Sequence, residues 1–169
     1  MRRIFCCFAF CLLLFSITAC SAPATQTASD VNFCFRCNAD VDFNGEQFHC
    51  GLSRTAPGRM SVQFLSGDLK DLSYDWNGDG FSVSYKDLCA KSEECVLPDS
   101  AFASVLVRVL DYAERSDSLT PGSGGTLTGT FQDVDFLLTI DKKSGNIQTL
   151  VIPEKNLSVK FNTSGNKKV

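Results

Sequence analysis

The stretch from Val31 to Leu52, VNFCFRCNADVDFNGEQFHCGL, decides the fold. Apolar and polar residues alternate from Val31 through Phe43, which predicts a long strand with one apolar face. Asn44-Gly45 is a strong short signal for a hairpin turn, and the alternation resumes after it. A two-residue turn keeps apolar residues facing apolar residues, which supports this register. The predicted cross-strand pairs are Val41 with Phe48, Ala39 with Cys50, Cys37 with Leu52, and Asp40 with His49.

The same alternation recurs along most of the remaining chain, and one segment departs from it. From Pro98 to Arg115 the apolar residues fall at helical spacing, which predicts one amphipathic helix capped by Asp99 or Ser100. The further predicted strands cover residues 60–64, 72–76, 81–85, 127–131, 134–140, a segment through 150–152, and 157–161. The short turns between them favour an antiparallel sheet.

This layout predicts a mainly β fold with one helix. About nine strands at roughly 4.8 Å each are much wider than one helix about 10 Å across. We therefore expect a curved antiparallel sheet, an unclosed half-barrel, with the amphipathic helix packed on its concave face. Any concave surface left uncovered would form a hydrophobic groove. The candidate groove residues are Phe33, Phe35, Phe64, Tyr74, Trp76, Tyr85, Phe102, Leu106, Leu110 and Phe136.

The sequence does not predict a metal site at the cysteines near the first hairpin. Cys34 and Cys37 have opposite parity in a regular strand, so they point to opposite faces. Cys34 lies about 20 Å along the strand from the position opposite His49, whereas zinc ligands lie about 2.0–2.3 Å from their ion. A bulge near Cys34 would reopen the question. We interpret Cys37 and Cys50 as small buried hydrophobic residues.

Cys89 and Cys95 lie in the segment CAKSEEC, which we interpret as a polar loop between the fifth strand and the helix. Both ends of such a loop can approach each other, and an exported protein can form disulfides. The sequence leaves two alternatives open, a disulfide between Cys89 and Cys95 or two free thiols.

No metal, cofactor or catalytic site is predicted. Asp75 to Gly80, DWNGDG, matches the first half of a calcium loop, but Lys86 stands where the loop needs a bidentate acid. We interpret this segment as a hairpin tip, where Asn, Asp and Gly tolerate positive φ. His49 is the only histidine, and its parity puts it on the outer face beside Asp40. We therefore expect a protein that is not an enzyme.

The N-terminus resembles a secretion signal. A basic start, Met1-Arg2-Arg3, precedes a short apolar run that ends in Ile17-Thr18-Ala19-Cys20. This ending resembles the bacterial lipobox, whose cysteine carries a lipid after cleavage. Cys20 is then the lipidated residue and holds the chain at the extracytoplasmic face of the cell membrane. The alternatives are a plain signal peptide cut near Ala19, or a retained anchor helix.

The predicted organisation has four parts. Residues 1–19 are a lipoprotein signal peptide, 20–30 the lipidated cysteine and a flexible tether, 31–162 a single β-rich domain, and 163–169 a disordered tail. The formal net charge is −3 without a basic stripe, so nucleic acid is not an expected partner. We expect a monomer attached to the membrane through Cys20.

Three segments carry a resemblance to a known group. LKDLSYDWNGDGFSVSYKDL (69–88), LPDSAFASVLVRVLD (97–111) and LVIPEKNLSVKF (150–161) resemble short Clostridia-type membrane-anchored lipoproteins of unknown function. With the lipobox and the tether, the pattern also resembles the LolA/LolB-like and LppX-like lipoprotein carriers. This resemblance implies an unclosed barrel with a helical lid over an apolar cavity that shelters acyl chains. The sequence departs from those carriers, since no helix precedes the first strand and one helix lies inside.

Two functions follow as hypotheses. The first is a membrane-anchored module that binds a lipid or another apolar ligand in the half-barrel groove. The alternative is a non-catalytic interaction or scaffold domain with a filled core, which contacts other envelope components through its surface.

Overall fold

The computed structural model describes residues 28–116 and 119–162. The predicted signal peptide, the tether up to residue 27 and the tail from residue 163 lie outside the described residues. The strands are β1 (Phe35–Phe43), β2 (Glu46–Ala56), β3 (Arg59–Phe64), β4 (Leu72–Asn77), β5 (Phe81–Tyr85), β6 (Leu88–Ser92), β7 (Thr120–Pro121), β8 (Thr126–Phe131), β9 (Val134–Ile140), β10 (Ile147–Ile152) and β11 (Leu157–Asn162). The helices are α2 (Phe102–Arg115) and three 3-10 turns, η2 (Ala28–Asp30), η3 (Ser123–Gly125) and η4 (Pro153–Lys155).

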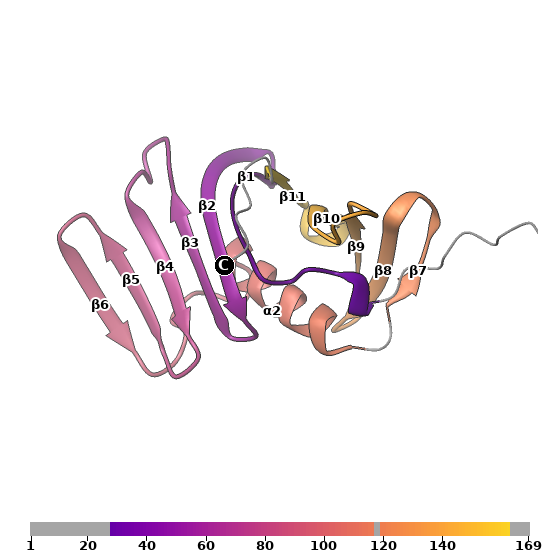
Figure 1. Cartoon of the computed structure of the whole chain (residues 1–169). Helices are drawn as coiled ribbons and strands as arrows, with labels where there is room; N and C mark the ends of the chain where they lie inside the picture. Colours follow the sequence, from indigo (N-terminus) through magenta and orange to yellow (C-terminus); the bar gives the residue numbers. More distant parts are fainter. Residues whose placement is uncertain (1–27, 117–118, 163–169) are drawn as a thin grey trace, which may run out of the picture.

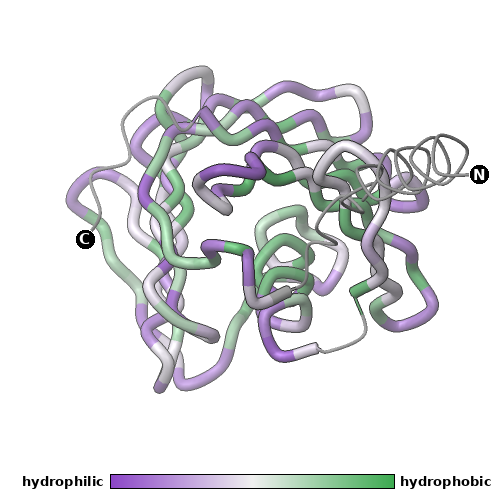
Figure 2. The backbone as a smooth tube through the Cα atoms, turned by 45° about the vertical axis from the view of Figure 1, so that its right-hand side comes forward, coloured by the Kyte–Doolittle hydropathy of each residue, from purple (hydrophilic) through white to green (hydrophobic). Residues whose placement is uncertain are grey.

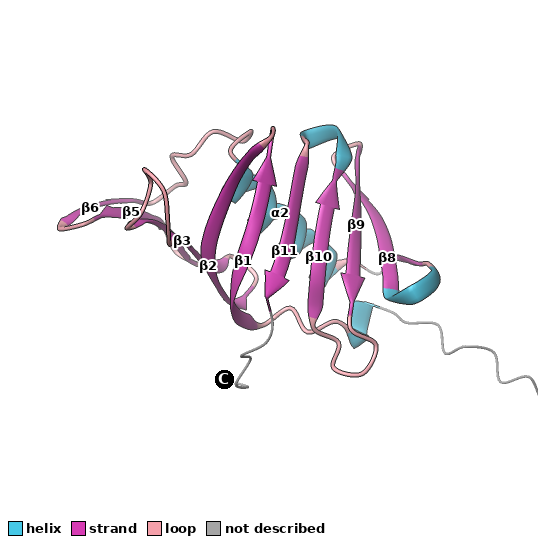
Figure 3. Ribbon diagram, turned by 90° about the horizontal axis from the view of Figure 1, so that it is seen from above, coloured by secondary structure: helices cyan, strands magenta, loops and turns pink. Residues whose placement is uncertain are grey.

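The strands form one antiparallel sheet in the order β6-β5-β4-β3-β2-β1-β11-β10-β9-β8-β7. The sheet is not closed and curves around α2 as a half-barrel (Figure 1). Seen from above, the helix lies on one face, while β5 and β6 extend past it (Figure 3). The predicted fold class is therefore confirmed.

The first hairpin has the predicted register. Val41 pairs with Phe48, Ala39 with Cys50, Cys37 with Leu52, and Asp40 with His49. Asn44 and Gly45 adopt φ of 54° and 83°, the left-handed values that a two-residue turn requires. On the far side of β1, β11 pairs so that Ala39 faces Phe161 and Val41 faces Val159. These pairings bring the two halves of the chain into one apolar face.

Helix α2 fills the concave side of the sheet. Its buried face includes Leu106 and Leu110, which are fully covered, and the helix lies inside the curve of the strands in Figure 2. At its start the Phe102 ring packs on Phe48 at 5.4 Å and on Phe64 at 5.8 Å between centroids. The helix is shorter than predicted and neither Asp99 nor Ser100 caps it, because Ala101 occupies that position and makes no side-chain cap bond.

Two strands were not predicted. β6 occupies most of the segment interpreted from the sequence as a polar loop, so that interpretation is wrong. It pairs with β5, which places Leu88 opposite Tyr85 and Ala90 opposite Val83. β7 spans only Thr120–Pro121 at the other edge of the sheet.

The first strand begins at Phe35, four residues later than predicted. Residues 31–34, here called the entry segment, instead run beside the β9–β10 turn. The Asn32 amide donates to the Gly145 carbonyl at 2.8 Å, and the Asn32 side-chain amide donates to Asn146 Oδ1 at 3.0 Å. Gly145 has φ of 71°, and a Cβ there would collide with the Asp30 carbonyl. The glycine therefore lets the chain pass close to this turn before it enters the sheet.

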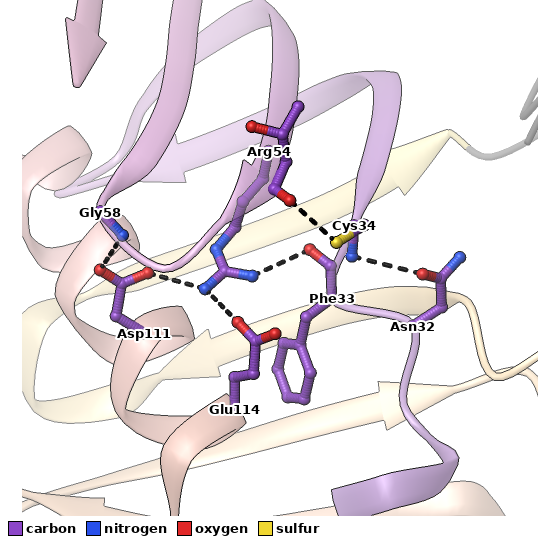
Figure 4. Close-up of polar contacts among 8 residues, drawn as sticks. Asn32, Phe33, Cys34, Arg54, Gly58, Asp111 and Glu114 are labelled. Carbon is purple, nitrogen blue, oxygen red and sulfur yellow. Dashed lines mark hydrogen bonds and ion pairs between the residues drawn. The ribbon is translucent and has the colours of Figure 1, made fainter. Parts of the chain in front are cut away.

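A buried arginine joins the helix, the sheet and the entry segment (Figure 4). Arg54 is 1% exposed, and its parity on β2 places it on the inner face. Its Nη2 donates to Asp111 at 2.7 Å and to Glu114 at 2.6 Å, both on α2. Its Nη1 donates to the Phe33 carbonyl at 3.0 Å. Asp111 also accepts the Gly58 amide at 2.8 Å, so α2 is bonded to β2 and to the β2–β3 turn.

The segment Asp75–Gly80 is a hairpin tip, as predicted. β4 ends at Asn77 and β5 begins at Phe81, with Gly78 between them at φ of 93°. The Asn77 side chain accepts the Asp79 amide at 3.0 Å, which closes the turn. Over residues 28–116 and 119–162, no three His, Cys, Asp or Glu side chains are grouped to hold a metal ion. In the same ranges, no helix has the length and apolar character needed to cross a membrane.

The Arg54 cluster generates a stability prediction. The double substitution Asp111→Asn with Glu114→Gln leaves the Arg54 guanidinium buried without a carboxylate, which costs about 3–5 kcal/mol. Adding Arg54→Met, which replaces the cation by an apolar side chain, should recover a large part of that loss. Urea unfolding of the wild type and the two variants measures both steps. A triple variant no more stable than the double variant would show that the unpaired buried charge is not the cause.

Candidate functional site

The structure divides the ten predicted groove residues into two groups. Seven are buried in the core and therefore line no open groove. These seven are Phe33, Phe35, Phe64, Phe102, Leu106, Leu110 and Phe136. The other three, Tyr74, Trp76 and Tyr85, keep part of their surface exposed. The groove as predicted is therefore mostly filled by α2 and the side chains around it.

The three remaining residues lie on a wing formed by β4, β5 and β6. Register places Trp76 opposite Phe81 and Tyr85 opposite Leu88 on the inner face of this wing. The rings of Trp76 and Phe81 pack at 5.0 Å, and Tyr74 stacks on Phe81 at 6.2 Å. Burial raises the pKa of Tyr74. Tyr85 is 38% and Leu88 73% exposed, so the apolar face is uncovered toward its outer edge.

An open cleft lies on the other side of α2, against β8, β9 and β10. Its volume is about 260 Å³. We call it the α2 cleft, and its apolar lining consists of Val105, Val109, Phe131, Val134 and Ile152. Val105 and Val109 face it because they are one helical turn apart on α2. Phe131 and Val134 close the β8–β9 hairpin, and Ile152 ends β10.

The rim of the α2 cleft is polar and carries two cations. Arg108 donates to Asp99 at 2.7 Å and to Gln132 at 2.7 Å, so its side chain bridges the segment before α2 and the β8–β9 turn. The guanidinium lies 5.5 Å from the centre of the Phe131 ring. Lys155 of η4 lines the same rim. The rim thus presents two positive charges against the one carboxylate of Asp99.

Sequence reasoning missed Arg108, Gln132 and Lys155. Gln132 and Asp133 form the turn between the predicted strands 127–131 and 134–140, with φ of 51° and 61°, and this turn brings Gln132 to Arg108. Arg108 falls between Val105 and Val109 on the helix, which was a signal for a cation at the border of the apolar face. No pattern in the sequence linked these positions to Lys155.

The cysteines form no disulfide in the described part of the chain, where each is a free thiol. Cys89 belongs to β6, and Cys95 Sγ lies 4.0 Å from Ser104 Oγ. Of the two alternatives that the sequence left open, the structure has the two free thiols. Cys50 is fully buried and Cys37 half-buried. Burial raises the pKa of Cys50 to about 12 and that of Cys37 to about 11, so both thiols stay protonated near neutral pH.

His49 lies on the outer face, as its parity predicted. Its Nδ1 is 2.8 Å from Asp40 Oδ1, and Asp40 Oδ2 accepts the Asn162 side-chain amide at 2.9 Å. The hydrogen bond from Asn162, followed by that from His49, lowers the pKa of Asp40. Cys34 Sγ lies instead at the Thr55 carbonyl, 3.2 Å away, on the neighbouring strand. The cysteines and the histidine of the opening stretch therefore make separate contacts.

No protein-family model and no curated protein matches the chain. Among solved structures, it is similar to an uncharacterized conserved protein from Thermus thermophilus, with 12% sequence identity, 80% of each chain covered and a TM-score of 0.49.

The burial of the thiols predicts their reactivity. A thiolate is the reacting species, so Cys50, which is protonated and covered, should not be modified by a maleimide in the folded protein. Cys34, Cys89 and Cys95 are exposed and should react first. Mass spectrometry of peptides after a short pulse at neutral pH measures the order. Modification of Cys50 as fast as Cys89, under conditions that keep the protein folded, would contradict the described core.

Proposed function

We propose that this chain is a membrane-anchored extracytoplasmic lipoprotein that binds an anionic amphiphile, with its acyl chain in the α2 cleft. The anchor is the lipid on Cys20. The observation that supports the binding role is the cleft itself, which combines the half-buried apolar side chains of Phe131 and Val134 with two cations. No residue of the chain is proposed to catalyse a reaction.

The chemistry of the cleft favours an acyl chain with a negative head. Phe131 and Val134 are half-buried and offer apolar surface that an acyl chain can cover, while Val105, Val109 and Ile152 are buried in the core beside them. Arg108 and Lys155 stand at the opening, where a carboxylate or phosphate would gain charge-assisted hydrogen bonds. A volume of about 260 Å³ lies just below the range of drug-sized pockets, about 300–1,000 Å³. We therefore expect one short length of acyl chain to be sheltered.

The filled core limits how the ligand can bind. Leu106 and Leu110 are fully buried, and Arg54 bonds α2 to the sheet. A ligand entering the interior of the half-barrel would have to displace these contacts. The α2 cleft requires no such displacement, because it lies beside the helix and is already open.

The alternative is an interaction domain for another envelope component. Its support is the wing, where β6 is an edge strand and Leu88 is 73% exposed. In this alternative the α2 cleft binds no ligand and the wing makes the biological contact. Measurement of ligand binding at the cleft separates the two functions.

The anchor is tested by labelling. Cells fed an azido fatty acid should label the wild-type protein and should not label Cys20→Ser, because the thioether cannot form. Equal labelling of the two proteins would show that Cys20 is not the anchor.

The α2 cleft is tested by calorimetry with octanoate, decanoate and dodecanoate. Each buried methylene contributes about 0.8 kcal/mol, so two carbons should tighten binding by roughly tenfold until the cleft is full. Arg108→Met removes the charge and keeps much of the volume, and it should weaken decanoate binding about tenfold. Val134→Phe should fill the cleft and abolish binding at every chain length.

Lys143→Met is the matched control, because Lys143 is an exposed cation on the β9–β10 turn, outside the cleft. It should bind decanoate like the wild type. Decanol should bind more weakly than decanoate, since it lacks the negative head. Affinity that does not change with chain length, or that survives Val134→Phe, would rule out the cleft and leave the interaction domain as the remaining function.

A further inference from the structure

A hollow with a polar lining lies on the outer, convex face of the sheet. Its volume is about 870 Å³, and side chains from β1, β2, β3, β4 and β11 surround it. We call it the convex hollow. Its polar lining consists of Arg36, Asn38, His49, Ser53, Ser61, Gln63, Asp75 and Asn162. It lies on the opposite face of the sheet from α2, so it is separate from the α2 cleft.

Gly51 explains why a strongly paired sheet is hollow at this point. It lies in the middle of β2, with Asn38 beside it on β1 and Gln63 beside it on β3. Each neighbour carries an amide side chain, whereas Gly51 carries none. The Leu65 side chain closes one side, 3.6 Å from where a Cβ of residue 51 would lie. The missing side chain therefore forms the floor of the hollow.

A row of polar residues crosses four strands beside this floor. Arg36 pairs with Ser53, Ser53 with Ser61, and Ser61 with Asp75. The row places a cation on β1 and a carboxylate on β4, about 14 Å apart at three strand spacings. Ser53 and Ser61 lie between these two charges, and their short side chains leave the surface recessed there. The charges at the ends balance, so the hollow does not select for a strongly charged ligand.

Two side chains that line the hollow, His49 and Asn162, are held in place by the neighbouring carboxylate of Asp40. The Asp40 carboxylate accepts from Asn162 at 2.9 Å and bonds His49 Nδ1 at 2.8 Å. Asp40 itself does not line the hollow, while both of its partners do. A carboxylate that fixes two lining side chains reduces the cost of ordering them when a ligand binds.

Five of the other lining side chains are free to bond a ligand. Within residues 28–116 and 119–162, the side chains of Arg36, Asn38, Gln63, Ser53 and Ser61 make no hydrogen bond or ion pair to the protein. Together they offer amide and hydroxyl groups that both donate and accept, with one guanidinium that donates only. This mixture suits a ligand whose surface is itself covered with groups that donate and accept.

We propose that the convex hollow binds a glycan, a ligand with many hydroxyl or acetamido groups. Such a ligand can bond the amides and hydroxyls on the floor, and its neutral units match the balanced charges of the row. Leu65 is the main apolar side chain of the lining, which disfavours an acyl chain here. The volume lies inside the usual range for ligand sites, about 300–1,000 Å³. The extracytoplasmic location that would expose this face to envelope glycans rests on the proposed anchor at Cys20.

The test uses the full chain in lipid nanodiscs and three neutral probes, chitotetraose, cellotetraose and maltotetraose. Calorimetry and ligand-observed NMR should detect binding of at least one probe at millimolar or lower concentration. Gly51→Leu fills the floor of the hollow, and an added Cβ meets only ordinary contact distances there, so the variant should fold. It should weaken binding of that probe at least tenfold.

Ser84→Leu is the matched control. Ser84 lies on the outer face in the same cross-strand row as Gly51 and Ser73, but it does not line the hollow. It should bind the probe like the wild type. A second variant, Asn38→Ala with Gln63→Ala, removes the two amides without filling space and should also weaken binding at least tenfold.

Three outcomes would overturn the proposal. They are no binding of any of the three probes, binding unchanged by Gly51→Leu and by the double alanine variant, or equal loss in Ser84→Leu. Decanoate binding measured on the Gly51→Leu variant keeps the two sites distinct, since it should equal that of the wild type. If only Val134→Phe loses decanoate binding, the result concerns the α2 cleft and does not bear on the glycan site.

Discussion

The buried guanidinium of Arg54 is the constraint on which the arrangement of the molecule depends. A cation with 1% exposure needs partners, and its contacts join three parts of the chain: the entry segment, β2 and α2. Asp111 and Glu114 come from successive turns of the helix, so satisfying the cation also fixes where the helix lies. Removing a partner would leave an uncompensated buried charge. The helix is therefore best understood as a fixed part of the core.

A fixed helix on a much wider sheet leaves surface uncovered. The sheet has eleven strands, whereas a helix is about 10 Å across. Core side chains fill the centre, where Ala39, Leu138 and Val159 are fully buried. The inner surface that remains is the wing on one side and the α2 cleft on the other. On the convex face, the hollow results from Gly51 in the middle of β2, and its lining is mostly polar.

The sequence predicted the features that depend on local pattern. Alternation and Asn44-Gly45 indicated the first hairpin with its register, and helical spacing located α2. β6 was missed because Leu88 to Ser92 shows no clear apolar alternation, and β7 is two residues long. Arg54 has the same parity as Phe48, Cys50 and Leu52, so the sequence already indicated that its side chain points to the inner face. Its partners were not, because Asp111 lies 57 residues away in the chain. The α2 cleft and the convex hollow each combine strands whose meeting depends on the final curvature of the sheet.

The claim that α2 stays in place while a ligand binds beside it is tested most directly by an NMR titration. Decanoate added to the isotope-labelled protein should shift the amide signals of residues 105–109, 131–134 and 152–155, which surround the cleft. The signals of Phe64, Leu110 and Phe136, which are buried in the core, should stay in place. Shifts spread over these core residues and over Arg54 would contradict the account, because they would show that the ligand displaces the helix and enters the half-barrel.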